Sequence, residues 1–196
     1  MKAGIIITAA GRAERFQKAG GQGNKLNALL NDGSVFAQTL HHALASGLAV
    51  HVVTRPENSE IQALCRAQQV PFTLIASSGL GESIAAGVCA TPQWHGWLIH
   101  LADMPFVPPS VFVEVAQALE FHPLVRPYVN AQPGHPVGFS PAWFGKLCQL
   151  TGDNGARELL HGETIHFIEV KDSDSQRDID LPSQLIQRSE KNHAAP

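Results

Sequence analysis

The chain has 196 residues, of which 44% are hydrophobic and 16% are charged, and its formal net charge is −3 with neutral histidines. This length suits one sizeable core, because domains usually contain about 100 to 200 residues. The slightly acidic balance gives no basis for a basic nucleic-acid-binding surface, and no apolar stretch approaches the roughly 20 residues that span a bilayer. Composition therefore predicts a globular protein that binds neither nucleic acid nor membranes.

The three cysteines, Cys65, Cys89 and Cys148, are odd in number and widely spaced. None belongs to a C-x-x-C motif, so the spacing indicates neither a disulfide framework nor a zinc ribbon. We expect small buried hydrophobic residues in a reducing compartment. Met1 and Lys2 lead directly into an apolar run with no signal-peptide cleavage site, and we therefore expect a cytoplasmic protein.

Short apolar runs alternate with helix-like segments through the first half of the chain. Strands are predicted at residues 4–8, 49–54, 72–76 and 97–102, and helices at residues 35–46, 57–69 and 84–90. A strand without polar alternation is buried on both faces, which is typical of a parallel sheet with helices on each side. The sequence therefore predicts an α/β fold.

Residues at the ends of the first two helices have the expected capping chemistry. Ser34 can accept a hydrogen bond from the first turn of helix 35–46, and Gly47 follows that helix where a left-handed residue is best tolerated. Pro56 precedes the second helix and Pro71 follows it, and both positions suit a ring that lacks a backbone N–H. These residues set the expected helix boundaries.

The second half of the chain is more irregular, because prolines break it into short pieces. The prolines are at positions 123, 127, 133, 136 and 141, and strands are expected at residues 124–130, 136–139 and 164–170. Asp153 is expected to cap a helix over residues 154–161. No linker-like segment separates the halves, so we predict one domain over residues 1–190 and a frayed tail over residues 191–196.

The first strand leads into a segment rich in glycine and basic residues, here called the basic loop (residues 9–25), with Arg12, Arg15, Lys18 and Lys25. At the carboxyl edge of a parallel sheet, glycines let backbone amides approach a phosphate and basic side chains neutralise it. A nucleoside triphosphate fits this chemistry. No hydroxyl residue follows Lys25 as in a Walker loop, and the glycine spacing does not fit G-x-G-x-x-G. A flexible, solvated basic loop is the alternative interpretation.

A carboxylate, Asp103, follows the fourth predicted strand on the sheet edge that carries the basic loop. There it can bind Mg²⁺, which prefers one or two carboxylates together with phosphate oxygens. A second acidic segment, with Asp178 and Asp180, can supply another ligand. The alternatives are a turn-forming or helix-capping role for Asp103 and a helix cap before Pro182 for the second segment.

A third polar segment, residues 77–83, joins the third predicted strand to the helix at residues 84–90. Its glycines Gly79 and Gly81 and the hydroxyl of Ser83 can bind a base edge or a phosphate near a helix N-terminus. Serine and glycine are also common in ordinary turns and caps, which is the alternative.

Six motifs occur in order, at residues 9–25, 79–88, 101–105, 134–139, 151–157 and 178–182. The first is similar to A-A-G-x-S-x-R-x-G-x-x-K and the third to a G/A-D-M-P turn. Together they resemble the nucleotidyltransferases with a Rossmann-like fold, most closely the molybdenum cofactor cytidylyltransferases within the MobA-like family. The resemblance covers nearly the whole chain. It implies a three-layer α/β sandwich with a mostly parallel sheet and an irregular, acceptor-binding second half.

The resemblance also implies a reaction, transfer of CMP from CTP to the terminal phosphate of a molybdopterin-type cofactor with release of pyrophosphate. Catalysis would depend on Arg15 and Lys25 at the phosphates and on Mg²⁺ held by Asp103, with Asp180 as a second ligand. The implied nucleotide-binding residues are Ala9, Ala10, Gly11, Arg12, Gly79, Gly81 and Ser83. The implied acceptor-binding residues are His135, Pro136, Gly155 and Arg157. A molybdoenzyme or its chaperone would be a partner.

Two features of the basic loop bear on the substrates. Ala10 stands where guanylyl-transferring relatives carry a second glycine, which by resemblance favours CTP over GTP. The loop departs from the family pattern at Ala13 and Phe16 and through an insertion within residues 18–23. This departure leaves two alternatives open: a sugar- or polyol-phosphate acceptor, or a non-catalytic carrier that binds molybdopterin or a nucleotide.

Overall fold

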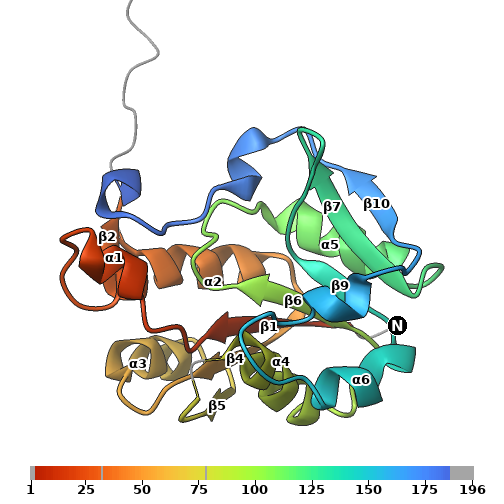
Figure 1. Ribbon diagram of the computed structural model, residues 1–196, viewed down its shortest axis with the longest axis horizontal. Coiled ribbons are helices and arrows are strands. Elements are labelled where there is room, and N and C mark those ends of the chain that lie inside the picture. Colours follow the sequence, from red (N-terminus) through yellow and green to blue (C-terminus); the bar gives the residue numbers. More distant parts are fainter. Residues whose placement is uncertain (1–2, 32, 78, 186–196) are drawn as a thin grey trace, which may run out of the picture.

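An eight-stranded sheet forms the middle layer of the computed structural model, which describes residues 3–31, 33–77 and 79–185 (Figure 1). The strands are β1 (Gly4–Ala9), β4 (Ala49–Thr54), β5 (Phe72–Leu74), β6 (Trp97–Leu101), β7 (Leu124–Val129), β8 (Gln132–Pro133), β9 (Val137–Phe139) and β10 (His166–Glu169). Their order is β10-β7-β9-β6-β1-β4-β5, with β8 paired to β7. β2 (Leu29–Leu30) and β3 (Gly33–Ser34) form a separate hairpin.

The sheet is mostly parallel, as predicted. β6, β1, β4 and β5 pair in parallel, and β10 pairs in parallel with β7. β9 is antiparallel to both of its neighbours, β6 and β7. The regular strand–helix alternation therefore ends after β6, where the proline-rich half of the sequence begins.

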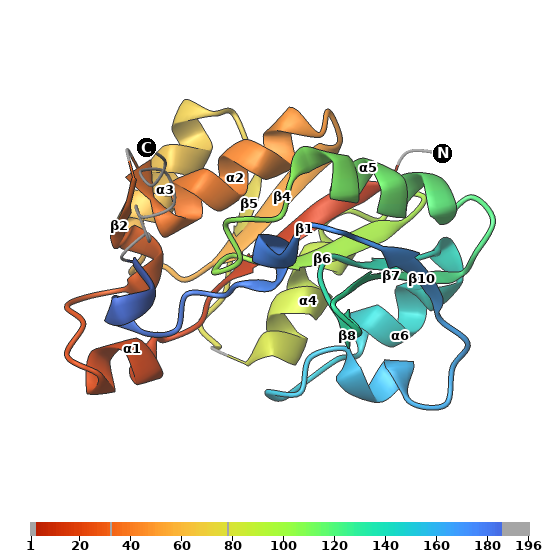
Figure 2. The same ribbon diagram turned by 90° about the horizontal axis from the view of Figure 1, so that it is seen from above.

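Helices cover both faces of the sheet. They are α1 (Glu14–Lys18), α2 (Val35–Ala45), α3 (Ser59–Ala67), α4 (Leu80–Cys89), α5 (Pro109–Ala118) and α6 (Phe144–Cys148), with short 3₁₀ helices η1 (Lys25–Asn27), η2 (Pro141–Trp143), η3 (Arg157–Leu160), η4 (Ser173–Gln176) and η5 (Pro182–Leu185). In Figure 2, α2, α3 and α5 lie on one side of the sheet and α4 and α6 on the other. No helix in the described ranges has the length and apolar character needed to cross a membrane.

The two hydrophobic layers follow from the alternation of side chains along β1. Ile5 and Ile7 pack into the layer under α2, α3 and α5, and Ile6 packs into the layer under α4 and α6. All three are fully buried. Because both faces are covered, the strand reads as a continuous apolar run, which confirms the basis of the α/β prediction.

Both ends of α2 agree with their predicted caps. The Ser34 Oγ accepts a hydrogen bond from the Ala37 N–H (3.1 Å), and Gly47 has a φ of 76°. The cap predicted at Asp153 is wrong, because η3 starts later and has no side-chain cap. Gly155, with a φ of 57°, breaks any helix that would begin at residue 154. The tail predicted at residues 191–196 lies outside the described residues.

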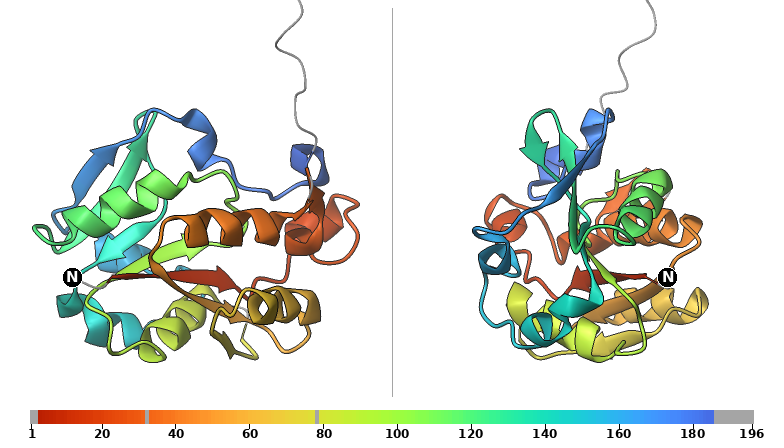
Figure 3. Two further views of the ribbon diagram at one scale, coloured as in Figure 1. Left: turned by 180° about the vertical axis from the view of Figure 1, so that it is seen from behind. Right: turned by 90° about the vertical axis from the view of Figure 1, so that its right-hand side faces the viewer.

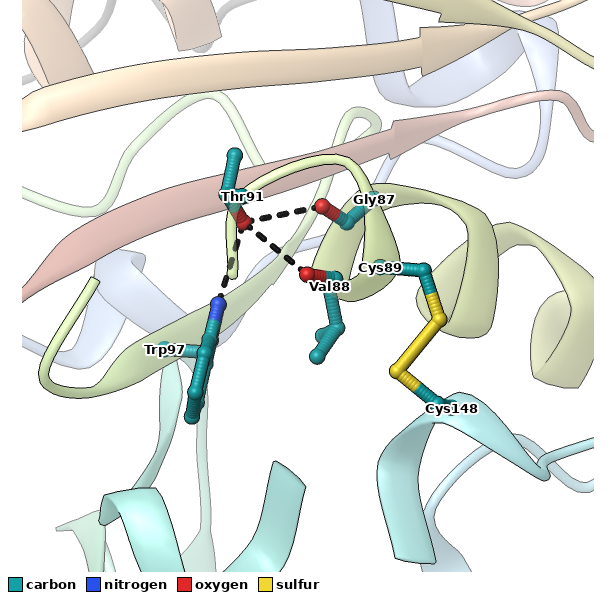
Figure 4. The surroundings of a disulfide bond; sticks show 6 residues. All are labelled: Gly87, Val88, Cys89, Thr91, Trp97 and Cys148. Carbon is teal, nitrogen blue, oxygen red and sulfur yellow. Dashed lines mark hydrogen bonds between the residues drawn. A yellow bond between two sulfur atoms is a disulfide. The ribbon is translucent and has the colours of Figure 1, made fainter. Parts of the chain in front are cut away.

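The cysteine prediction is right for Cys65 and wrong for the other two. Cys65 is buried and free, but Cys89 and Cys148 form a disulfide between the ends of α4 and α6, with their Cα atoms 5.8 Å apart (Figure 4). Their separation of 59 residues gives no hint of this pairing. It arises because α4 and α6 pack side by side on the same face of the sheet.

Gly87 lets α4 lie close to the sheet, and replacing it should destabilise the fold. A Cβ at Gly87 would be 2.6 Å from Ile6 Cγ2 and 2.9 Å from Val53 Cγ2. Gly87→Ala is therefore expected to lower the free energy of unfolding by about 1–3 kcal/mol, measured by urea denaturation. The matched control is Gly145→Ala in α6, where a Cβ meets no atom of the described residues within 4 Å and stability should stay the same or rise. Equal stability of the two variants would contradict the close packing of α4.

Candidate active site

The carboxyl ends of β1 and β6 lie side by side, because the strands are parallel neighbours with Thr8 opposite Leu101. The Ala102 N–H donates to the Thr8 carbonyl (3.2 Å), so the segments that leave the two strands start next to each other. The basic loop and Asp103 consequently meet at this edge, where ligands of parallel α/β sheets bind.

The basic loop folds into two short helices, α1 and η1, which lie on either side of the insertion. α1 buries Phe16, and the chain then turns back toward the sheet. Asn24 caps η1, since its Oδ1 accepts from the Leu26 N–H (3.0 Å), and its Nδ2 donates to Asn58 Oδ1 (3.1 Å). η1 begins at Lys25. The insertion therefore leaves Lys25 at the sheet edge.

Four charged side chains predicted as site residues come together here. Lys25 Nζ lies 2.6 Å from Asp103 Oδ2 and 2.5 Å from Asp180 Oδ1. Arg15 Nη1 lies 3.0 Å from Asp180 Oδ2. The side chains of Lys25 and Asp103 are only 14% and 20% exposed, whereas that of Arg15 is 82% exposed. Lys25 is thus the shielded centre of the group, and Arg15 reaches it from solvent.

The chain returns to this edge long after β10, and that return brings Asp180 to the group. Figures 2 and 3 show the C-terminal segment, in blue, running from β10 back to the neighbourhood of α1. The Ile179 N–H donates to the Asp103 carbonyl (2.9 Å), and the Ile179 side chain is fully buried. This anchor places Asp180, and not Asp178, in contact with Lys25.

The charges of the group act on one another's pKa values. Burial alone would lower the pKa of the Lys25 ammonium, but attraction to Asp103 and hydrogen bonds to Asp103 and Asp180 outweigh it and raise that pKa. Burial would raise the pKa of Asp180, but the hydrogen bond from Lys25 and its charge lower it. The pKa of Asp178 is raised by burial and by repulsion from Asp180 and Asp103. Lys25 therefore stays protonated and Asp180 ionised at neutral pH.

The carboxylates at this edge also fit a hard divalent cation. Asp103 Oδ1 is buried and has no hydrogen-bond partner among the described residues, so this oxygen has no protein donor. In those residues no three His, Cys, Asp or Glu side chains form a metal-binding group. The protein would thus supply Asp103, with Asp180 beside it, and a ligand's oxygens the rest, which is the mode Mg²⁺ favours.

A cavity of about 230 Å³ opens beside the charged group. Its lining includes five of the predicted residues: Ala10, Gly11, Lys25, Ser83 and Asp103. The remaining wall is formed by Thr8, Ala13, Leu26, Leu80, Leu101 and Ala102. The basic loop, the first turn of α4 and the end of β6 therefore enclose one space, although they lie far apart in the sequence.

The other predicted nucleotide-binding residues lie outside this lining. The Ala9 carbonyl accepts hydrogen bonds from Thr54 Oγ1 (3.2 Å) and Asn58 Nδ2 (3.3 Å), and Arg12 is exposed. Gly79 and Gly81 are buried at the start of α4, which begins earlier than predicted.

Gly81 instead connects the start of α4 to the loop at residues 151–152. Its N–H donates to the Gly152 carbonyl (2.8 Å), and a Cβ there would be 2.5 Å from the Thr151 carbonyl oxygen. The Ser83 hydroxyl donates to the Gly79 carbonyl (3.0 Å). The contacts of Gly81 hold residues 151–152 against the start of α4.

A second cavity, of about 390 Å³, adjoins the first and shares Leu80 and Leu101 with it. We call it the second pocket. It is lined by Leu80, Ile84, Ile99, Leu101, Arg126, Pro133, His135, Val137, Asn154, Ala156, Arg157 and Leu160. His135 and Arg157, two predicted acceptor-binding residues, lie in it. Pro136, joined to His135 by a cis peptide bond, and Gly155, packed against Leu80, lie just behind the lining.

Two polar lining residues, Arg126 and Asn154, were not predicted. Arg126 lies in β7, and its Nε donates to the Gly134 carbonyl (2.8 Å). The sequence does hold a signal for it, because an arginine interrupts the otherwise apolar strand at residues 124–129. Asn154 lies in the loop before η3, and no comparable signal marks it.

Comparison with known proteins identifies the family and the fold. Residues 5–169 match the model of the MobA-like NTP transferase domain. The purine catabolism protein PucB of Bacillus subtilis is 28% identical over 91% of this chain and 92% of its own. The crystal structure of Rv0371c from Mycobacterium tuberculosis superposes with a TM-score of 0.80 at 22% identity, covering 93% of this chain and 94% of that one.

Two further structures share the fold. Rv0371c in complex with manganese has a TM-score of 0.75 at 20% identity, covering 88% of this chain and 90% of that one. Molybdopterin-guanine dinucleotide biosynthesis protein A from Archaeoglobus fulgidus has a TM-score of 0.68 at 18% identity, covering 92% and 94%. The family model spans most of the chain, and the chain therefore belongs to the MobA-like NTP transferase family of nucleotidyltransferases.

Proposed function

We propose that the protein transfers CMP from CTP to the terminal phosphate of a molybdopterin-type cofactor and releases pyrophosphate. The observation that carries the proposal is the pair of adjoining cavities. One contains Lys25 and Asp103, and the other combines apolar walls with Arg126 and Arg157. A nucleotide in the first and an acceptor in the second would meet near Leu80 and Leu101, which both cavities share.

In this proposal the chain's own residues bind and orient the two substrates. A phosphate oxygen of the acceptor attacks the α-phosphate of the nucleotide, and the bond to pyrophosphate breaks. Lys25, shielded from solvent, stabilises negative charge on the phosphates, and the exposed Arg15 adds to it from outside. Asp103 and Asp180 hold Lys25 in place. Such catalysis depends on positioning and charge neutralisation and needs no protein nucleophile.

A divalent cation is part of the proposal, and Mg²⁺ is our choice. The unpartnered oxygen of Asp103, with Asp180 nearby, supports it, as does the manganese complex of the structurally similar Rv0371c. When bound, such an ion supplies positive charge to phosphate oxygens.

The base preference, the cellular location and the partner complete the proposal. Ala10 lines the first cavity, and a methyl group there supports CTP over GTP by family resemblance. A cytoplasmic location, expected from the sequence, is retained as part of the proposal. A molybdoenzyme or its chaperone is the proposed partner that would receive the product.

The test is pyrophosphate release measured with each nucleoside triphosphate, Mg²⁺ and molybdenum-loaded molybdopterin. We expect the highest kcat/KM with CTP, by about tenfold or more over GTP. Turnover only with a sugar or polyol phosphate would favour that acceptor class instead. Cofactor binding without pyrophosphate release from any triphosphate would favour a non-catalytic carrier.

A further inference from the structure

Arg126 occupies an unusual place in the sheet. Side chains alternate along β7, so Arg126 lies on the same face as Leu124. Leu124 packs there in the apolar cluster with Ile99 and Val137. Arg126 is the next residue on that face and lines the second pocket beside the same two residues. A guanidinium thus stands where the alternation would place another apolar side chain.

No acidic group compensates this guanidinium in the part of the chain that the structure describes. Among the described residues, Arg126 forms one hydrogen bond, from Nε to the Gly134 carbonyl (2.8 Å), and no ion pair. Its pKa is lowered by burial. No described carboxylate lines the second pocket either. A half-buried cation without a counter-ion is costly, and an anionic ligand that reached its free Nη amines would relieve that cost.

His135 does not provide a second positive charge at neutral pH. Its pKa is lowered to about 4 by burial and by the nearby Arg126 charge. Its Nδ1 lies 3.4 Å from the Ile99 carbonyl. Arg157 also lines the pocket but is exposed at the rim. Among the lining residues, Arg126 is therefore the positively charged residue that lies beside the buried Ile99 and Val137.

The rest of the lining restricts the kind of ligand. Most of the residues are aliphatic, including Ile84, Ile99, Val137 and Leu160. A polyhydroxylated ligand would lose hydration there without enough hydrogen-bonding partners. A flat ring system would lose less, because its faces carry no hydrogen-bonding groups and its polar atoms lie at its edge.

From these observations we infer that Arg126 is the anion-binding residue of the second pocket, and that this pocket selects a ring system bearing an acidic group. The inference rests on the proposed function only in treating the pocket as the acceptor site. It names the chemistry of the acceptor and assigns its recognition to Arg126, in place of the histidine that the family motif points to.

Binding of two fluorescent probes, a pterin carboxylate and unsubstituted pterin, tests the inference. The wild-type protein is expected to bind the carboxylate about 10- to 100-fold more tightly than the neutral ring. Ribose 5-phosphate, a polyhydroxylated anion, is expected to bind more weakly than the pterin carboxylate. Equal affinity for the two pterins, or tighter binding of the sugar phosphate, would overturn the inference.

Two variants separate anion binding from a structural role. Arg126→Lys keeps the charge but loses the planar Nε–H, whereas Arg126→Gln can still donate to the Gly134 carbonyl but is neutral. We expect the lysine variant to retain most of the preference for the carboxylate and the glutamine variant to lose it. A structural role predicts the reverse order. Arg66→Gln on α3 is the matched control and should behave like the wild type.

Failure of the inference about Arg126 can be distinguished from failure of the proposed function. An Arg126-dependent preference without pyrophosphate release from any nucleoside triphosphate would overturn the proposed function and support the inference. Pyrophosphate release with an unchanged KM for the acceptor in Arg126→Gln would do the opposite. If the melting temperature shows that the glutamine variant does not fold, two results still test the inference. They are the preference of the wild type for the pterin carboxylate over pterin and the retention of that preference in Arg126→Lys.

Discussion

Asp103→Asn is expected to reduce the rate of pyrophosphate release by about 100- to 1000-fold. Asparagine keeps the size of the side chain but removes the negative charge. Its amide also places a donor at one of the two oxygens, of which Oδ1 is buried without a partner in the described structure. Both changes would weaken the binding of a divalent cation at this edge of the sheet. The measurement is steady-state pyrophosphate release at saturating triphosphate and increasing Mg²⁺.

The variant should stay folded, because Lys25 keeps its second partner. In the wild type, Lys25 Nζ lies 2.5 Å from Asp180 Oδ1, and this ion pair does not involve Asp103. We therefore expect a melting temperature close to that of the wild type. Glu114→Gln on the exposed surface of α5 is the matched loss of one negative charge and should leave activity unchanged. Full activity of Asp103→Asn in a folded protein would remove Asp103 from the proposed site.

Lys25→Met is expected to impair both activity and stability. The rate of pyrophosphate release should fall by about 100- to 1000-fold. The substitution removes the cation that lies between Asp103 and Asp180 and leaves three carboxylates, including Asp178, near one another. Stability at pH 7 should fall by about 1–3 kcal/mol. Lys171→Met, at an exposed position just after β10, is the control for loss of a lysine.

The loss of stability in Lys25→Met should depend on pH, because it depends on the charge of the neighbouring carboxylates. In the wild type, the lowered pKa of Asp180 contributes stability that is present above its ordinary value of 3.8 and is lost as the pH falls through the lower folded value. Without Lys25 the remaining carboxylates repel, so their folded pKa values rise and protonation relieves the strain. The difference in melting temperature should be largest near neutral pH and shrink as the pH falls toward about 4.

A divalent cation provides an independent check on Lys25→Met. Mg²⁺ or Mn²⁺ at millimolar concentration should raise the melting temperature of the variant more than that of the wild type, because it can replace the missing positive charge. A variant as stable as the wild type at neutral pH, with no response to either ion, would contradict the electrostatic role assigned to Lys25.

Local sequence determined the layers of this fold. Ile5, Ile6 and Ile7 have no polar alternation, and a strand of that kind has to be buried on both faces. Ser34 and Gly47 fixed the ends of α2 for reasons that lie within a few residues. Where prediction failed, at Asp153, the left-handed Gly155 just downstream decided the outcome.

The sequence also determined which residue types gather at the site, since Lys25 and Asp103 follow strands that must end at the same edge. Only the tertiary structure decided which partners they meet. Asp180 reaches Lys25 because the buried Ile179 ties a distant segment to Asp103. Cys89 meets Cys148, and Arg126 enters the second pocket, through helix and strand packing. Contacts across such separations depend on how whole elements pack, and no local pattern encodes that.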